Sequence, residues 1–255
     1  MRIGSLQVGP GEPCALIAEI GNAHDGDFAR AIRLLNAAKE AGASAAKLQT
    51  YTPAELVGLR GDGPAPEPWG SQGWTMETLY QKARTPLAWI PVLFDHAYQI
   101  GLPLFSSVFG AESLAVLEAA ACPVYKIAKF ERQAEPLQLA VAATGKPMIV
   151  SVPKRYDNAI IAADVERLYC PGSYPCAVED VHLPWNFREA GYLGLSSHCL
   201  DPLLPVAAVA RGCSLIEMHF QLAEEPSELE SNVSLTQYAF AQMIQDVRQV
   251  ERMLA

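Results

Sequence analysis

The sequence lacks the features that define several other classes of protein. No apolar run approaches the roughly 20 residues of a membrane-spanning helix, and the first apolar run, residues 15–21, contains Glu19 and follows no basic leader. Basic residues are in deficit, because 19 Lys and Arg face 28 Asp and Glu and leave a formal charge of −9. This balance argues against nucleic acid as a partner. We therefore expect a cytoplasmic protein that acts on neither membranes nor nucleic acids.

Two further absences narrow the chemistry. The six cysteines show no paired spacing typical of a zinc site, and we expect reduced thiols in a chain of 255 residues without a leader. No G-x-G-x-x-G motif follows any predicted strand, which argues against a doubly wound dinucleotide-binding sheet. No internal repeat or linker divides the chain, so we expect one domain over residues 1–255.

Short apolar runs alternate with amphipathic segments along nearly the whole chain. The predicted strands are residues 15–20, 45–50, 103–108, 124–129, 147–152, 165–170, 192–197 and 215–220. The predicted helices are residues 27–41, 86–100, 110–120, 135–144, 178–190, 201–211 and 235–254. Strands that are apolar throughout and alternate with helices are typical of a parallel sheet. Eight such strands in a chain of this length predict a (β/α)8 barrel.

Two segments depart from this alternation. Residues 60–74 are rich in Gly and Pro and predict a loop over the mouth of the barrel. Residues 154–163 leave room for only a short helix between the fifth and sixth strands.

Polar side chains gather where the predicted strands end, which is where (β/α)8 barrels carry out catalysis. Several lie two residues apart on one strand, and such pairs point to the same side. We therefore expect them to meet in one cavity. They are Glu19, Lys47, Gln49, Ser106, Ser107, Lys126, Lys129, Glu131, Ser151, Tyr174, Ser196, His198, Glu217 and His219.

Lysine is scarce in this chain and is concentrated at the predicted mouth. Of only seven lysines, Lys47, Lys126 and Lys129 lie at strand ends. An acidic protein that gathers its few lysines in one place is expected to bind an anion there. Neutral donors from Gln49, Ser107, Ser151 and Ser196 make a phosphate or a carboxylate the favoured ligand.

Two histidines end neighbouring strands. His198 closes the seventh strand and His219 the eighth, so a closed barrel places their imidazoles near each other. Such a pair predicts a divalent-metal site with positions left open for water or a substrate oxygen. The alternative is that each is a hydrogen-bonded histidine of the core. Because Ser196 and Glu217 flank the pair, we favour the metal site.

A series of sequence blocks resembles the sialic acid synthase family, and within it the pseudaminic acid synthase branch. The blocks follow the predicted strands in the order in which that family has them. They are IAEIGNAHDGD (17–27), AKEAGASAAKLQTY (38–51), LYQKARTP (79–86), FSSVF (105–109), YKIAKFE (125–131), TGKPMIVS (144–151), YCPGSYP (169–175), GLSSH (194–198) and EMHF (217–220).

The resemblance implies a homodimeric barrel enzyme that condenses phosphoenolpyruvate with an aldose and releases phosphate. It implies that His198 and His219 bind a divalent cation, usually Mn²⁺, with Mg²⁺ or Co²⁺ as alternatives. Glu19 and Glu217 would supply acid–base chemistry, with Lys47 beside them, and Glu131 and Tyr174 would contact the sugar. Phosphoenolpyruvate would be held by Lys47, Gln49, Ser107, Lys126, Ser151 and Ser196.

The departures from the family pattern concentrate on the sugar side. Lys129 stands where a serine is usual and adds a cation beside the phosphate, and Glu230 stands where the family has an aspartate that touches substrate. The resemblance covers the barrel, and we expect no C-terminal antifreeze-like domain in this chain. These differences predict a non-standard acceptor aldehyde.

Two other functions stay open. Lys126 or Lys129 at a barrel strand end could form a Schiff base, as in a lysine-dependent aldolase. Alternatively, the chain could be a non-catalytic sensor of a phosphorylated metabolite.

Overall fold

The computed structural model describes residues 1–153 and 165–255 of the chain. The short helix expected at 154–163 lies outside the described residues.

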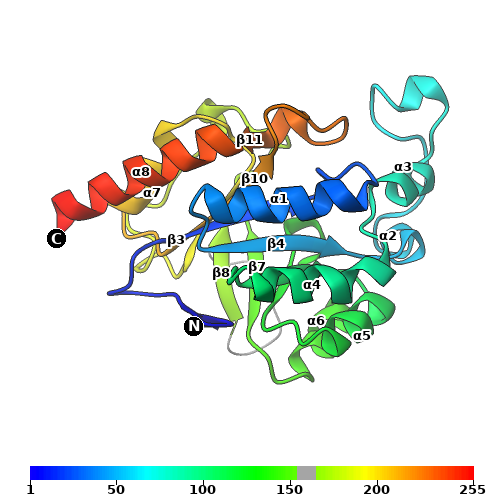
Figure 1. Cartoon of the computed structure of the whole chain (residues 1–255), viewed down its shortest axis with the longest axis horizontal. Helices are drawn as coiled ribbons and strands as arrows, with labels where there is room; N and C mark the ends of the chain where they lie inside the picture. Colours follow the sequence, from blue (N-terminus) through cyan, green and yellow to red (C-terminus); the bar gives the residue numbers. More distant parts are fainter. Residues whose placement is uncertain (154–164) are drawn as a thin grey trace.

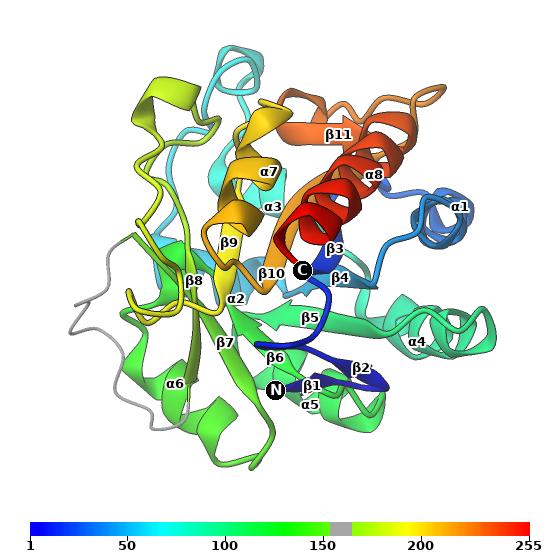
Figure 2. The same ribbon diagram turned by 90° about the vertical axis from the view of Figure 1, so that its left-hand side faces the viewer.

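Eight parallel strands close into a barrel (Figure 2). Each strand pairs with the next along the chain, and β10 pairs with both β9 and β3, which joins the last strand to the first. The barrel strands are β3 (Ala15–Gly21), β4 (Ala45–Thr50), β5 (Leu104–Val108), β6 (Tyr125–Ile127), β7 (Met148–Val152), β8 (Val165–Tyr169), β9 (Gly194–Ser197) and β10 (Leu215–Gln221). The predicted (β/α)8 fold and its eight strands are confirmed.

Both faces of the parallel strands are covered, as expected when helical crossovers connect them. All seven residues of β3 and all seven of β10 are buried, and sheets with helices outside and side chains inside need such apolar strands. An N-terminal hairpin, β1 (Arg2–Ile3) with β2 (Leu6–Gln7), adds Ile3 and the following Val8 to the same hydrophobic core.

Six of the seven predicted helices surround the barrel. They are α1 (Phe28–Glu40), α4 (Ile90–Gln99), α5 (Ala111–Ala119), α6 (Glu135–Ala142), α7 (Leu203–Ala210) and α8 (Gln237–Leu254). The helix predicted at 178–190 is wrong, because that segment contains only the short 3-10 turn Val178–Asp180. Pro184 interrupts it, since proline disfavours helical geometry at the residue before it and donates no hydrogen bond.

Besides the N-terminal hairpin, two helices and one short strand were not predicted. The helices α2 (Pro53–Arg60) and α3 (Met76–Ala83) bracket the loop expected at 60–74, and the short strand β11 (Ser234–Thr236) pairs with β10. In Figure 1, the arrowhead of β4 points toward α2 and α3, whereas both termini lie at the opposite end of the molecule. The two helices and the loop therefore stand at the carboxyl ends of the strands.

One predicted strand is shorter than expected. β6 ends at Ile127, and residues Lys129–Glu131 form a 3-10 turn instead of continuing the predicted strand 124–129. Lys129 and Glu131 are therefore not a same-face pair on a strand, and their side chains take different directions.

The helix α2 is held in place at its start. The Thr52 side chain accepts from the backbone N–H of Glu55, whose own carboxylate accepts from the N–H of Thr52. This reciprocal cap satisfies two helix donors. The other oxygen of Glu55 accepts from the N–H of Ser113 at 3.0 Å, which ties α2 to α5.

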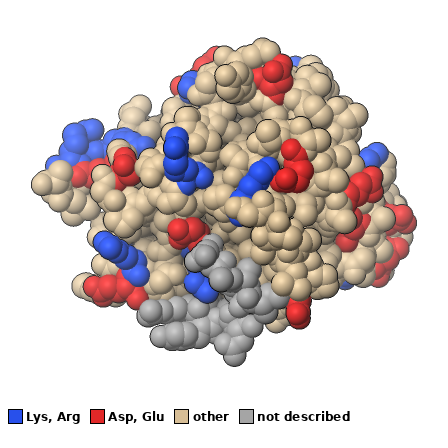
Figure 3. Space-filling model, turned by 90° about the horizontal axis from the view of Figure 1, so that it is seen from below, with Lys and Arg blue, Asp and Glu red and all other residues tan. Residues whose placement is uncertain are grey.

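The surface carries both signs of charge. On the face drawn in Figure 3, Lys and Arg alternate with Asp and Glu, and no broad basic patch covers the coloured area. Among the helices that the structure describes, each is too short or too polar to cross a membrane.

A substitution of Gly194, at the start of β9, tests the packing that closes the barrel. A β-carbon there would collide with the backbone carbonyl of Leu215 on β10, which cannot rotate away. Gly194→Ala should destabilise the fold by about 3 kcal/mol, the cost of forcing an atom into a filled interior. Urea unfolding measures this, with Gly63→Ala as the control, since a β-carbon at Gly63 meets nothing within 4 Å. Equal unfolding midpoints for the two variants would contradict the packing described here.

Candidate active site

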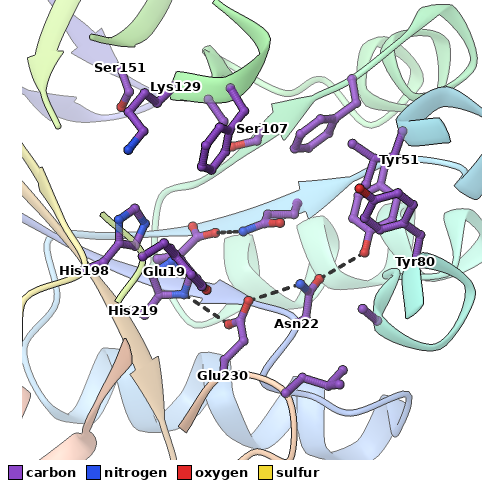
Figure 4. Close-up of a pocket in the computed structure, with 18 of the residues that line it drawn as sticks. Glu19, Asn22, Tyr51, Tyr80, Ser107, Lys129, Ser151, His198, His219 and Glu230 are labelled. Carbon is purple, nitrogen blue, oxygen red and sulfur yellow. Dashed lines mark hydrogen bonds and ion pairs between the residues drawn. The ribbon is translucent and has the colours of Figure 1, made fainter. Parts of the chain in front are cut away.

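A cavity of about 310 Å³ opens at the carboxyl ends of the strands. It is lined by nearly all the residues that the sequence predicted for a site: Glu19, Lys47, Gln49, Ser107, Lys126, Lys129, Ser151, Tyr174, Ser196, His198, Glu217, His219 and Glu230. The exceptions are Glu131 and Ser106; the hydroxyl of Ser106 lies 2.7 Å from Thr50 Oγ1 and donates to the carbonyl of Leu48 at 3.1 Å, outside the cavity. Figure 4 shows Ser151, Lys129 and His198 toward one end of the cavity and Tyr51 and Tyr80 toward the other.

Two buried lysines and two buried carboxylates alternate across the polar end. Lys47 Nζ lies 2.6 Å from Glu19 Oε2, and Lys126 Nζ lies 3.1 Å from both carboxylate oxygens of Glu217. Lys47 Nζ is also 3.9 Å from Glu217 Oε1, which joins the two pairs. Burial of single charges would be costly, and the alternation of sign offsets that cost.

Neutral side chains complete this network. Lys47 Nζ donates to Ser107 Oγ at 2.9 Å, Gln49 Nε2 donates to Glu19 at 2.8 Å, and Ser196 Oγ donates to Glu217 at 2.9 Å. Ser151 Oγ is buried and has no hydrogen-bond partner among the residues that the structure describes. A buried hydroxyl normally has a hydrogen-bond partner. The hydroxyl of Ser151 is therefore available to donate to a ligand oxygen at the polar end.

The two carboxylates have different acidities. Burial raises the pKa of Glu19, and the charge of Lys47 only partly opposes that rise. Burial also acts to raise the pKa of Glu217, but Lys126 and Lys47 together outweigh it and lower this pKa to about 2. Two carboxyl groups whose environments separate their pKa values are suited to different roles in proton transfer.

The two histidines lie together as predicted. Their ring centroids are 5.3 Å apart, and the Tyr174 ring lies 4.5 Å from that of His198. In the described ranges 1–153 and 165–255, His198 Nδ1 is buried and finds no hydrogen-bond partner. Burial lowers the pKa of His198 well below its usual value, which keeps this imidazole neutral.

The donor set fits a divalent cation held by two imidazoles. His219 Nδ1 lies 3.1 Å from Glu230 Oε2, and a carboxylate on one ring nitrogen leaves the other free for a metal. Within the described part of the chain, His, Cys, Asp and Glu form no group of three or more that could hold a metal ion. The two histidines would therefore leave several coordination positions to water and substrate.

Glu230 belongs to a chain of contacts as well as to the cavity wall. Besides His219, it accepts from Asn22 Nδ2 at 3.1 Å, and Asn22 Oδ1 in turn accepts from Tyr51 OH at 3.4 Å (Figure 4). Gly21 has a φ of +49°, and a β-carbon at this position would lie 2.6 Å from Glu230 Oε2. Glycine at position 21 is thus needed for Glu230 to reach His219.

Lys129 bridges two loops. Its Nζ donates to the carbonyls of Pro171 at 3.0 Å and Gly172 at 2.6 Å, so the loop after β8 is fastened to the turn after β6. The ammonium lines the cavity, but much of its hydrogen-bonding capacity is used within the protein.

Glu131 does not reach the cavity, and this geometry does not support the predicted contact between Glu131 and a sugar. Its side chain is buried, and Oε1 accepts from Arg60 Nε at 2.5 Å. Arg60 lines the cavity in its place. Sequence reasoning missed Arg60 because it missed α2, although the T-P-A-E sequence at 52–55 is a helix-start signal two turns ahead of it.

The fold and the cavity define a (β/α)8-barrel enzyme with a charged active site. The sequence matches the NeuB family over residues 34–255. It is 34% identical to the pseudaminic acid synthase of Helicobacter pylori, over 93% of this chain and 74% of that protein. It is also 34% identical to the pseudaminic acid synthase of Campylobacter jejuni, over 100% of this chain and 78% of that protein. The chain belongs to the NeuB family.

Solved structures support the same fold. A Leptospira borgpetersenii N-acetylneuraminic acid synthetase superposes with a TM-score of 0.85 at 22% identity, covering 100% of this chain and 90% of that one. The Bacillus subtilis spore coat polysaccharide biosynthesis protein SpsE superposes with a TM-score of 0.77 at 27% identity, covering 100% and 72%. The family resemblance and the synthase class expected from the sequence are confirmed.

His24, in the loop after β3, gives the fold a dependence on pH. It is fully buried, accepts from the N–H of Gly26 through Nδ1 at 3.0 Å and lies 3.0 Å from Thr85 Oγ1. Burial lowers its pKa to about 4. The unfolded chain therefore binds the proton first, so stability is complete above about pH 6.5 and is lost as the pH falls toward 4, by about 3 kcal/mol in total.

Urea unfolding at pH 7 and pH 4 tests this effect. Compared with the wild type, His24→Gln should lose less stability between the two pH values, by about 3 kcal/mol. His182→Gln, at an exposed histidine, is the control. If His24→Gln and the wild type lose equal stability, His24 is not the titrating group.

Proposed function

We propose that the protein condenses phosphoenolpyruvate with an aldose, giving a 3-deoxy-2-keto acid of the nonulosonic type and phosphate. The observation that carries the proposal is the convergence of two buried lysines and three serines on one cavity beside two carboxylates. The pseudaminic acid synthases among its relatives support this choice of reaction.

Phosphoenolpyruvate is a small trianion and suits the polar end of the cavity. Lys47 and Lys126 supply charge, and the serines supply short hydroxyl donors around it. Without ligand, the lysines are paired with Glu19 and Glu217. Arrival of the anion would give each lysine a second negative partner and leave the carboxylates freer to exchange protons. Gln49, Ser107, Ser151 and Ser196 would complete the binding set.

The reaction needs proton transfers that the carboxylates can supply. The enol carbon C3 attacks the aldehyde carbon, which forms the new C–C bond and leaves an alkoxide that takes one proton. Water then adds to C2 and loses one proton. The bond between C2 and the phosphate oxygen breaks, the new hydroxyl becomes the keto oxygen, and its proton passes to the departing phosphate. Glu19 and Glu217 would move these protons, since both face the cavity and differ in acidity. Lys47 and Lys126 would stabilise the departing phosphate.

A divalent cation, Mn²⁺ above Mg²⁺ or Co²⁺, would be held by His198 and His219. When bound, it supplies Lewis-acid polarisation of the acceptor carbonyl. Glu230 would fix the orientation of His219, and Tyr174, whose ring lies against His198, would cover the site and face the sugar. We also propose that the protein forms a homodimer.

Phosphate release from phosphoenolpyruvate with Mn²⁺ and a panel of aldoses tests this function. His219→Ala should lower phosphate release by about a hundredfold or more, with Mn²⁺ affinity reduced in electron paramagnetic resonance and the fold retained. His96→Ala, at a histidine bonded to Asn36 outside the cavity, is the control. If the wild type binds phosphoenolpyruvate but releases no phosphate with any aldose, the result would favour the alternative function, a non-catalytic sensor of a phosphorylated metabolite.

Borohydride trapping separates the Schiff-base aldolase from the proposed reaction. Burial lowers the pKa of Lys126, a property that nucleophilic lysines share. Its ammonium is nevertheless hydrogen-bonded to both oxygens of Glu217. We expect no covalent adduct with pyruvate or an aldose in mass spectrometry. An adduct on Lys126 or Lys129 would overturn the proposed reaction.

A further inference from the structure

Trp69 differs from the other three tryptophans of the chain. It lies in the loop that joins α2 and α3 (Figure 1), and its side chain lines the cavity. Trp74, Trp89 and Trp185 do not line the cavity, and each has a cation or an aromatic ring against its indole, at distances of 5.1 to 5.7 Å. Among the residues that the structure describes, no group of either kind lies against Trp69.

Four other rings of the cavity wall already contact a neighbouring ring. Tyr51 packs edge-on against Tyr80 and Phe109, at centroid distances of 6.3 and 5.5 Å. The ring of Tyr174 lies 4.5 Å from that of His198. Each of these four rings therefore has a partner within the protein.

The last ring of the wall, Phe130, lies against two cations. The guanidinium carbon of Arg60 is 5.3 Å and Lys129 Nζ is 4.9 Å from its centre. Lys129 donates only to neutral carbonyls, so the positive charge on this side of the cavity lies over Phe130 and not over Trp69. In the described ranges of the chain, Trp69 is thus the aromatic lining residue whose indole faces are left to a ligand.

The loop around Trp69 is a compact turn. The carbonyl of Pro66 accepts from the N–H groups of Trp69 and Gly70, both at 3.0 Å, and the N–H of Ala65 donates to the carbonyl of Trp74 at 2.9 Å. A β-carbon at Gly70 would collide with the carbonyl oxygen of Ala65, so the turn closes only with glycine there. The backbone that carries the indole is therefore fixed before a ligand arrives, which lowers the entropy cost of binding.

An indole face suits the carbon skeleton of a sugar better than an anion. The face of an aromatic ring is electrically negative, so it attracts carbon-bound hydrogens, which are slightly positive, and repels a phosphate or a carboxylate. Apolar side chains of α2 and α3 form the wall beside Trp69: Leu56, Met76, Leu79 and Ala83. Of the two substrates, the aldose is therefore the one that this wall fits.

We propose that Trp69 is a binding residue for the acceptor, with its indole face against the carbon-bound hydrogens of the sugar, and that it takes no part in binding phosphoenolpyruvate. This inference rests on the proposed condensation, and it adds to it a side chain that recognises the carbon skeleton of the second substrate.

Steady-state kinetics of Trp69 variants test the inference. Phosphate release is measured with phosphoenolpyruvate, Mn²⁺ and each of N-acetylmannosamine, mannose and arabinose. Trp69→Ala should raise the KM for every reactive aldose by about tenfold or more, because the stacked ring and its buried apolar area are lost, and should leave the KM for phosphoenolpyruvate unchanged. Trp69→Phe keeps a flat ring and should recover most of that loss.

Two controls separate recognition from folding. Trp185→Ala, at an indole that is 84% exposed and outside the cavity, should leave both KM values unchanged. The alditols of the same three sugars lack the reacting carbonyl and allow binding to be followed without turnover. They should change the tryptophan emission of the wild type and of Trp74→Phe, but not that of Trp69→Phe. A merely structural role for Trp69 in its loop would leave this emission change in place.

Several outcomes would overturn the inference. They are an unchanged aldose KM in Trp69→Ala, an equal rise in the KM for both substrates, and an alditol-induced emission change that is absent from the wild type or persists in Trp69→Phe. Saturation-transfer NMR of the alditols tests binding independently. If no aldose releases phosphate but the alditols bind and Trp69→Ala weakens that binding, the assignment of Trp69 stands and the proposed reaction fails. If no alditol binds, the inference fails.

Discussion

The position of β10 between β9 and β3 is the constraint on which the site depends. This strand carries Glu217 and His219, and its pairing with β9 places Glu217 opposite Ser196, while its pairing with β3 places His219 opposite Glu19. The close approach of Gly194 to Leu215 makes the first of these pairings possible. The pairings that close the barrel therefore also bring the charged groups of the site together.

The cavity has two ends with different electrostatics. At one end, four charges alternate in sign over short distances, so each is stabilised by its neighbours although water is largely excluded. At the other end, the Arg60–Glu131 pair stands in an aromatic surround. An anion and a molecule with an apolar face can therefore lie side by side in one space, which suits a reaction that joins two unlike substrates.

The sequence was informative where periodicity and chemistry agreed. Eight apolar runs predicted the eight strands, and polar residues at their ends predicted the cavity wall, because a parallel barrel brings all carboxyl ends to one face. The sequence was less informative where the local backbone geometry decides the direction in which a side chain points. Glu131 was predicted from its spacing to Lys129, but β6 ends two residues before Lys129 and the following turn carries Glu131 behind the wall. The position of Arg60 depends on the helix α2. The cap of α2 at Thr52 involves neighbouring residues and can be read from the sequence, but the contact between α2 and α5 joins residues far apart in the chain and cannot.

Glu230 and Gly21 are coupled by geometry. The extra methylene that glutamate has over aspartate carries the carboxylate of residue 230 into the volume that a side chain at residue 21 would fill. A side chain at residue 21 is therefore incompatible with glutamate at residue 230, and the positive φ of +49° favours glycine at residue 21 as well. Anyone who redesigns this part of the cavity wall should vary positions 21 and 230 together, because a side chain at position 21 needs a shorter side chain than glutamate at position 230.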